Sequence, residues 1–456
     1  MNQEVSKVLE HKSAVFPFLD KPVEIYKLEN GHTIVIANKH GELVNISTWV
    51  RTGSINEDDQ INGISHFLEH LMFKGTPEHP AGEFDRTLEA RGAIVNAATW
   101  KDYTFYYVTL PKGPNDEYFK EALDLHADMM LNAFLPEHEI GPIFDFQNPD
   151  VKEKRERYVV IEEIRMRDDQ PWSKTYNELN HIMYTEHPYV MDVIGTGEII
   201  SSIPRQTIVD YYKKWYTADN FITIIVGDVD TEKTLGLVRE KFKSAESKPE
   251  AKVKHPQEPP QTQPRLVENT SRLNTAFTIF GFHGPEASNL KETIAIDAIS
   301  IILGESKSSR LHQNLIEKPE TPVFNVVGTG QYQFKDGNTF FIQANFHPSQ
   351  RRKALELLKV EIRKMIDFPV SQEELDKAKK KMKGRFASES ETVSEIGESI
   401  GHYMTICDDI SCYTDYLSTL NTLTVQDLFE VARKYLDLNK VNISILLPEH
   451  EEGEAR

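Results

Sequence analysis

The stretch "VNISTWVRTGSINEDDQINGISHFLEHLMF", residues 44–73, decides the fold because its pattern recurs later in the chain. It begins with alternating apolar and polar residues, turns at Gly53, and continues with a helical apolar period. Residues 276–304, "AFTIFGFHGPEASNLKETIAIDAISIILG", follow the same course with a turn at Gly284. The two segments predict the same strand-to-helix unit and indicate an internal duplication.

A second pair of segments supports the duplication. "YTADNFITIIVGD" and "YLDLNKVNISILLPE" share the spacing Tyr-x-x-x-Asn before an alternating strand. The paired residues are Tyr216 and Asn220, and Tyr435 and Asn439. Between the halves, residues 243–264 are rich in Pro, Lys, Glu and Gln without an apolar period, which is typical of a linker. We expect an N-terminal extension at 1–20, a first domain at 21–242, this linker, and a homologous domain at 265–456.

Length and composition agree with two folded domains. A single core rarely grows beyond about 250–300 residues, and this chain has 456. Each half mixes short strands with long helices, which predicts an α+β fold in which a mostly antiparallel sheet packs with helices.

The bulk composition excludes several classes of protein. The net charge of −19 disfavours nucleic acid as a partner. No apolar run approaches the roughly 18–20 residues of a membrane span, and the first residues lack the apolar core of a signal peptide, so we expect a cytoplasmic protein. Cys407 and Cys412 are too few for a disulfide framework and are interpreted as structural.

A polar triplet in the first helix carries the chemistry. His66, Glu69 and His70 lie at i, i+3 and i+4 and therefore share one helix face. Two imidazoles one turn apart can bind one zinc ion, and the glutamate between them can act as a general base on water. The alternative is a pair of core histidines, which is disfavoured because a buried Glu beside them needs a cation.

Aligning Gly53 with Gly284 shows what the second half has in place of the triplet. The matched positions are Asp297, Ser300 and Ile301. A helix that forms without the triplet does not need it for folding, which favours a functional role for the triplet in the first half.

A catalytic zinc site needs a third protein ligand, and the helical stretch 152–171 is the candidate. Helical spacing places Glu156, Val159, Val160 and Glu163 on one face. Glu163 is the expected ligand, and Glu156 is expected to accept from the free N–H of a ligand imidazole. The neighbouring Glu162 points about 100° away, toward Arg155 and Arg165. The alternative is a solvated face whose glutamates bind nothing.

The combined motifs resemble a known family. The triplet followed by "LMFKGT", then "RGAIVNAATWKDYTFYYVTLP", then "RERYVVIEEI", is similar to the inverted-zincin metallopeptidases, which include pitrilysin, insulysin and the mitochondrial processing peptidases. The resemblance runs from about residue 20 to 448 and favours a bacterial processing-peptidase-like member.

The resemblance implies a role for each matched residue. One zinc ion per chain would be held by His66, His70 and Glu163, with Glu69 as general base and Glu156 in support. Asn96 and Ala97 would lie on an edge strand to which an extended peptide adds as a further strand. The two domains would form half of a clam-like chamber.

Two departures from the family pattern matter. Residues 139–154, "EIGPIFDFQNPDVKEK", look like a surface insertion before the ligand helix. Self-sufficient members also carry a substrate-contacting Arg and Tyr in the second half, but the matching positions here are Ile316 and Val323, and Arg310 lies too early. We therefore expect a heterodimer with a homologous partner that carries the Arg/Tyr pair.

The sequence thus predicts a zinc endopeptidase that cleaves short or unfolded peptides. An active homodimer is a weaker alternative. The rival function is a non-catalytic structural or peptide-binding subunit of a processing-peptidase-like assembly.

Overall fold

The computed structural model describes residues 5–148, 155–248, 253–320 and 322–449. The chain forms two compact units, neither of which is continuous in sequence. The first comprises Met1–Arg165, Met191–His255 and Phe386–Thr414, and the second comprises Met166–Val190, Pro256–Arg385 and Asp415–Arg456.

The first unit is built on a seven-stranded sheet in the order β1-β2-β3-β7-β4-β6-β5. Neighbouring strands are antiparallel except for the parallel pair β3 and β7. The strands are β1 (Val8–Ala14), β2 (Val23–Leu28), β3 (Thr33–Asn38), β4 (Leu43–Val50), β5 (Ile94–Thr99), β6 (Thr104–Pro111) and β7 (Phe221–Gly227).

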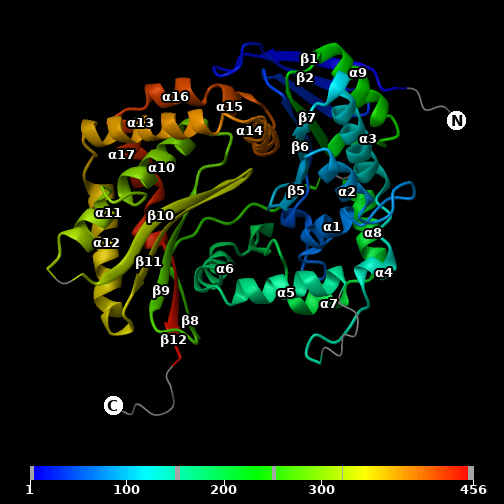
Figure 1. Ribbon diagram of the computed structural model, residues 1–456. Coiled ribbons are helices and arrows are strands. Elements are labelled where there is room, and N and C mark those ends of the chain that lie inside the picture. The colour runs from blue at the N-terminus through cyan, green and yellow to red at the C-terminus, as the bar shows by residue number, and fades with distance from the viewer. Residues whose placement is uncertain (1–4, 149–154, 249–252, 321, 450–456) are drawn as a thin grey trace. The chain divides into compact units, whose positions relative to one another are not determined.

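The first unit also contains helices, most of which contribute apolar side chains to its main core. They are α1 (Ile64–Met72), α2 (Glu83–Ala90), α3 (Glu117–Asn132), α4 (Glu137–Ile140), α5 (Glu156–Asp168), α7 (Gly197–Ser202), α8 (Arg205–Trp215), α9 (Thr231–Lys241), α14 (Val393–Ile406) and α15 (Ser411–Thr414). Figure 1 shows α1, α2, α3 and α8 gathered beside this sheet.

Helix α14 comes from the second half of the sequence but packs on β4 and β7 of the first sheet. Two glycines permit this close approach. A Cβ on Gly401 would overlap the indole of Trp49, and a Cβ on Gly397 would lie 2.5 Å from the Asn45 side-chain oxygen. Substituting either glycine would push the helix away from the sheet.

The second unit has a five-stranded sheet in the order β10-β11-β9-β12-β8, antiparallel except for the pair β12 and β8. Its strands are β8 (Arg265–Ser271), β9 (Ala276–Gly284), β10 (Phe324–Phe334), β11 (Gly337–Phe346) and β12 (Asn442–Pro448). Its helices are α6 (Pro171–Met183), α10 (Leu290–Leu303), α11 (Arg310–His312), α12 (Arg351–Asp367), α13 (Gln372–Ser388), α16 (Tyr416–Thr422) and α17 (Val425–Tyr435).

Helix α6 mirrors the behaviour of α14. It comes from the first half of the sequence and packs on β9 and β12 of the second sheet (Figure 1). A Cβ on Gly281 of β9 would lie 2.7 Å from Leu179 and 2.8 Å from the sulfur of Met183, so this glycine makes room for α6. Each sheet is therefore completed by a helix from the opposite half of the chain.

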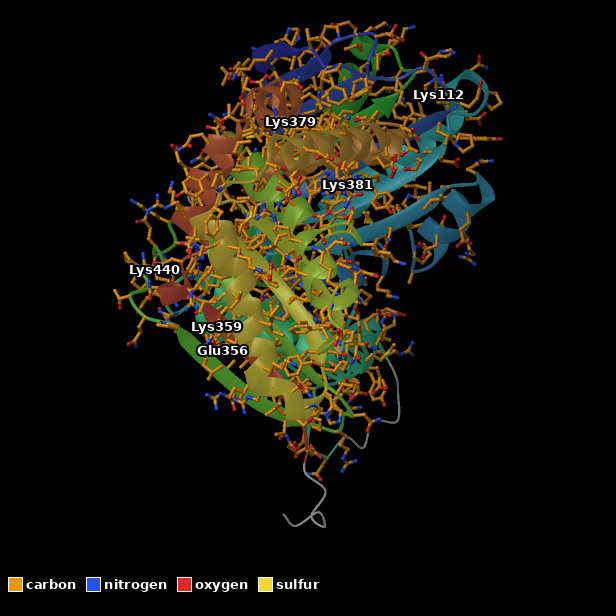
Figure 2. The ribbon with its side chains drawn as sticks, turned by 90° about the vertical axis from the view of Figure 1, so that its left-hand side faces the viewer. Lys112, Glu356, Lys359, Lys379, Lys381 and Lys440 are labelled. Carbon is orange, nitrogen blue, oxygen red and sulfur yellow. The ribbon has the colours of Figure 1, made fainter. Side chains whose placement is uncertain are left out.

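Two helices of the second unit carry charged side chains that are labelled in Figure 2, namely Glu356 and Lys359 on α12 and Lys379 and Lys381 on α13. On α12, the Lys359 ammonium lies 3.1 Å from the Glu356 carboxylate one turn away. On α13, Lys379 donates to the Leu423 carbonyl at 2.6 Å, just beyond the end of α16. A cation at this position also complements the negative end of the α16 dipole.

The two units repeat one order of elements, which confirms the predicted duplication and the α+β class. The strand and helix β4 and α1 correspond to β9 and α10, and the hairpin β5–β6 corresponds to β10–β11. Further along, α3, α5, α6, α8 and β7 correspond in turn to α12, α13, α14, α17 and β12.

The compact units differ from the expected boundaries in two ways. Residues 8–14, expected in an extension before the first domain, form the edge strand β1 of its sheet because they pair with β2. Residues 166–190 and 386–414 are exchanged between the units because the face of each sheet is covered by the other half's helix.

Parts of two expected segments lie outside the described residues, namely 149–154 of the insertion and 249–252 of the linker. The linker residues 253–264 contain no helix or strand. In the part of the chain that the structure covers, no helix is both long enough and apolar enough to cross a membrane. Neither Cys407 nor Cys412 forms a disulfide within the described residues, and Cys412 is buried.

Candidate active site

Helix α1 presents two distinct faces because its apolar residues recur with helical spacing. The apolar face is buried and consists of Ile64, Phe67, Leu68, Leu71 and Met72. His66, Glu69 and His70 lie on the opposite side and are only partly exposed. The core thus fixes the rotation of the helix, and the polar triplet projects together as the sequence predicted.

The start of α1 is held by a buried carboxylate from outside the helix. Gly63 precedes the helix with a φ of 93° and supplies no capping side chain. Glu57 accepts instead from the backbone N–H of Gly63 at 2.6 Å, from that of Ser65 at 2.9 Å and from the Asn62 amide at 2.8 Å. Burial raises the pKa of Glu57, and these hydrogen bonds oppose the rise. A carboxylate here also complements the helix dipole.

The structure brings His66 and His70 close to Glu163 of α5. Glu163 Oε2 lies 3.8 Å from His66 Nε2 and 3.5 Å from His70 Nε2. Ligands of a tetrahedral zinc ion with bonds of 2.0–2.1 Å are about 3.3 Å apart, so each of these two distances from Glu163 exceeds the ligand spacing by only a few tenths of an ångström. One atom from each residue falls within 4.8 Å of the other two, and no second group of this kind occurs among the described residues.

Glu156 supports the cluster from the first turn of α5. Its carboxylate lies 3.3 Å from His70 Nδ1, which leaves Nε2 of that ring facing Glu163. The Lys74 ammonium approaches the other Glu156 oxygen at 2.7 Å. Burial alone would raise the pKa of Glu156, but His70 and Lys74 lower it below its ordinary value. Burial alone would lower the pKa of His70, but the surrounding carboxylates raise it to about 9.

Lys74 is a residue of the site that the sequence did not predict. The available signal was its spacing, because Lys74 follows His70 by four residues and so continues the polar face of α1 one turn further. Lys74 lies beyond the last residue of the helix, Met72, so the periodicity alone did not require it to turn toward α5.

Glu69 is held by a residue from the sheet. The Thr99 hydroxyl at the end of β5 donates to Glu69 Oε2 at 2.5 Å. Burial raises the pKa of Glu69, while the Thr99 hydrogen bond and nearby His70 lower it. A carboxylate that is buried and oriented beside two imidazoles has the properties of a general base.

The boundary between the buried and exposed sides of helix α5 is sharper than expected. Val160 lies in the core, whereas Val159 remains 44% exposed, so these two valines do not share one environment. Glu162 turns away from the cluster and pairs with Arg165 at 2.5 Å, as predicted. Arg157 is buried under the helix, donates to the carbonyl of Ile203 at 2.8 Å and also to that of Ile200, and so fixes α5 in place.

Asn96 and Ala97 lie on β5, which is the edge strand of the first sheet. The side-chain oxygen of Asn96 accepts from the Ala97 N–H at 2.9 Å. Successive N–H groups of a strand point to opposite sides, so the Ala97 N–H points outward from the open edge of β5, away from β6. The Ala97 N–H therefore lies where we expect a peptide strand to pair. In this structure it donates to the Asn96 side chain instead.

Comparison with known proteins shows the family of this chain. Residues 33–197 match the profile of insulinase, peptidase family M16, and residues 202–382 match that of the peptidase M16 inactive domain. The zinc protease PqqE of Helicobacter pylori is 31% identical over 420 residues, which cover 90% of each chain. The chain belongs to peptidase family M16.

Other proteins are similar to this chain along nearly their whole length. An uncharacterised zinc protease of Bacillus subtilis, YmxG, is 27% identical over 413 residues, covering 90% of this chain and 95% of the relative. The crystal structure of a protease from Helicobacter pylori has a TM-score of 0.81 at 27% identity, covering 97% of this chain and all (100%) of that chain. The M16 inactive domain from Pseudomonas fluorescens has a TM-score of 0.83 at 18% identity, covering 95% of this chain and 100% of that chain, which shows a shared fold.

The second half of this M16 chain does not place an Arg/Tyr pair at the aligned positions. Ile316 packs against the apolar core of the second unit, and Val323 is buried in it. Arg310 is occupied by a two-pronged ion pair with Glu374, at 2.7 and 2.8 Å. This arrangement gives Arg310 a structural role within the second unit.

The second unit has an ion pair where the first has its candidate metal ligands. Asp297 on α10 occupies the position of His66, and Arg385 on α13 donates to it at 3.3 Å. Arg385 also donates to Glu305 at 2.6 Å, and the Tyr416 hydroxyl donates to Asp297 at 3.2 Å. A guanidinium therefore neutralises the buried carboxylate at this position of the duplicated unit.

Proposed function

We propose that this M16 protein is a zinc-dependent endopeptidase. The observation that carries the proposal is the convergence of His66, His70 and Glu163 around one point, with Glu69 beside them on the same helix face. Two histidines and one glutamate are a donor set of catalytic zinc sites, which keep one position open for water or substrate. Relatives named as zinc proteases support the same activity.

The residues divide the work of peptide hydrolysis. A bound zinc ion would polarise the scissile carbonyl and lower the pKa of the attacking water toward about 7. Glu69 takes the proton of that water on its carboxylate and delivers it to the leaving amine nitrogen. Glu156 accepts from His70 Nδ1 and so fixes the tautomer in which Nε2 is free as a ligand. Lys74 keeps Glu156 ionised and in place.

The substrate is a peptide in extended conformation. The open edge of β5 can pair with one more strand, and main-chain pairing of this kind accepts many sequences. Asn96 must release the Ala97 N–H when the peptide pairs there. This mode favours short or unfolded peptides, because a folded protein does not offer a free strand. Enclosure of the peptide in a clam-like chamber is part of the proposal.

The proposal includes a heterodimer in which a homologous partner supplies the Arg/Tyr pair. Its basis is the apolar environment of Ile316 and Val323 and the ion pair that occupies Arg310. The same observation favours a second candidate function, a non-catalytic peptide-binding subunit. A homodimer is the remaining alternative. The second candidate is weakened by the complete ligand set, since such a subunit has no use for it.

One experiment separates these functions. The chain is purified alone and with its candidate partner, its zinc content is measured, and cleavage of a quenched peptide is followed. We expect one zinc per chain, cleavage that requires the partner, and loss of cleavage with zinc retained in Glu69→Gln. A wild-type chain without zinc, or a Glu69→Gln variant that cleaves equally well, contradicts the peptidase. Full activity of the chain alone contradicts the division between two subunits.

A further inference from the structure

Thr99 connects the edge strand to the general base. It is the last residue of β5, pairs with Thr104 of β6, and is only 9% exposed. Its hydroxyl donates to Glu69 Oε2 at 2.5 Å. Glu69 belongs to α1, so this single hydrogen bond crosses from the sheet to the helix that carries the candidate metal ligands.

The hydrogen bond restricts how Glu69 can act. A hydroxyl bonded to a carboxylate at this distance is a strong, charge-assisted donor. It occupies one of the two carboxylate oxygens and suppresses rotation of the group, so the other oxygen is left to accept a proton. A general base works only within hydrogen-bond reach of that proton, and a displacement of about 1 Å can cost about a hundredfold in rate.

The same strand presents its open edge two residues earlier, at Ala97. On its other side β5 pairs with β6, and in the described residues no further strand covers its edge. A peptide that pairs at Ala97 adds hydrogen bonds to this edge and orders the strand up to Thr99. Strand addition and base orientation are therefore linked through the backbone of 97–99.

We propose that Thr99 is a positioning residue that couples peptide pairing on β5 to the orientation of Glu69. The inference rests on the proposed peptidase function. It means that a substrate long enough to pair with β5 is cleaved faster after binding than a truncated one with the same scissile bond. That advantage depends on the Thr99 hydroxyl.

The test compares Thr99→Val, which removes the hydroxyl at nearly constant shape, with Thr99→Ser, which retains it. The assay uses the complex with the partner and two quenched peptides, one long and one truncated, around the same cleavage site. In Thr99→Val we expect kcat on the long peptide to fall by about 10- to 100-fold, the range for losing a hydrogen bond to a charged group, with little change in KM. The kcat advantage of the long peptide should disappear in Thr99→Val and persist in Thr99→Ser.

Zinc content and melting temperature are measured on the same samples and should match those of the wild type. Wild-type kcat in Thr99→Val overturns the inference, as does equal loss in Thr99→Ser, or a retained length advantage in Thr99→Val. A change confined to KM also overturns it, because Thr99 would then act in binding alone. Failure of the wild-type complex to bind zinc or cleave either peptide refutes the proposed function instead, so the two failures are distinct.

Discussion

Arg385 donates to Asp297 at 3.3 Å in the second unit, at the position where the first unit brings Glu163 to His66. In both units the contact joins the helix after the strand-turn to a later helix, α1 to α5 and α10 to α13. The duplicated fold needs favourable charge at this junction because one group of each pair, His66 or Asp297, is largely buried. The first unit has side chains that could bind a metal cation, whereas in the second unit the Arg385 guanidinium supplies the positive charge.

Removing that side chain should destabilise the second unit. In Arg385→Ala, Asp297 stays buried without its cation, and we expect the free energy of unfolding to fall by about 1–3 kcal/mol, less than for a fully buried pair because Arg385 is partly exposed. Urea unfolding measures the change. Arg352→Ala, on an exposed position of α12, is the control. Equal stability of the two variants would show that the pair contributes nothing.

Zinc binding should distinguish two adjacent glutamates of α5. Glu163→Gln removes a charged ligand and should weaken zinc binding by more than the roughly 10- to 100-fold typical of an outer residue. Glu162→Gln should have no effect, because Glu162 pairs with Arg165 away from the cluster. Competition with a zinc chelator gives both affinities. Equal affinities would remove Glu163 from the ligand set.

Lys74 should affect zinc through Glu156. Lys74→Met removes the cation that holds the Glu156 carboxylate against His70, and we expect zinc affinity to fall by up to about tenfold. Lys112→Met is a matched control, since Lys112 is also partly buried and near a carboxylate, Asp228, but lies outside the site. The same chelator competition applies, and an unchanged affinity in Lys74→Met would contradict the supporting role.

The open edge of β5 should be sensitive to the loss of one N–H. Ala97→Pro removes the donor that points along the edge, and we expect kcat/KM to fall by about 3- to 10-fold through the lost hydrogen bond with the peptide. Ala97→Gly keeps the donor and serves as the control. Steady-state cleavage of the long quenched peptide gives the ratio. If Ala97→Pro is as active as Ala97→Gly, the peptide does not pair there.

Acid should destabilise the first unit through His32 and His126. Their rings bond to the Thr223 and Thr48 hydroxyls at 2.9 Å each, and burial lowers both pKa values from 6.5 to about 3. Between these values the unfolded chain binds a proton that the native histidine does not, so stability rises with pH in this window and falls as pH drops from about 6.5 toward 3.

Each of these histidines should contribute a slope of about 1.4 kcal/mol per pH unit inside the window. Urea unfolding at pH 5 and at pH 7 measures it. His126→Gln should reduce the loss on acidification, whereas His40→Gln should not, because the His40 side chain is 92% exposed. An identical acid loss in His126→Gln and wild type would assign the effect to other groups.

Local sequence patterns predicted several features of this structure. The spacing of His66, Glu69 and His70 put them on one helix face, and the same periodicity selected Glu163 and Glu156 on α5. Strand alternation and the repeated turn indicated the duplication and the α+β class. These features follow from side-chain direction within one element, which depends only on residue spacing.

Contacts between elements could not be deduced in this way. Glu57 caps a helix that starts seven residues later, and Thr99 reaches Glu69 from another element. The exchange of α6 and α14 between the sheets is likewise absent from any local period. Such contacts depend on which helix or sheet faces pack together. The sequence indicates which face of an element is apolar more strongly than it indicates which other element packs on that face.

The sequence by itself determined two repeated strand-and-helix units, a polar helix face suited to zinc, and a second acidic helix face to complete it. The tertiary structure decided that these faces meet within ligand distance, that Lys74 and Thr99 join them, and that Arg385 fills the corresponding place in the second unit. The physical reason is that periodicity fixes the direction of a side chain along its own element. Only the packing of the core brings two such directions to one point.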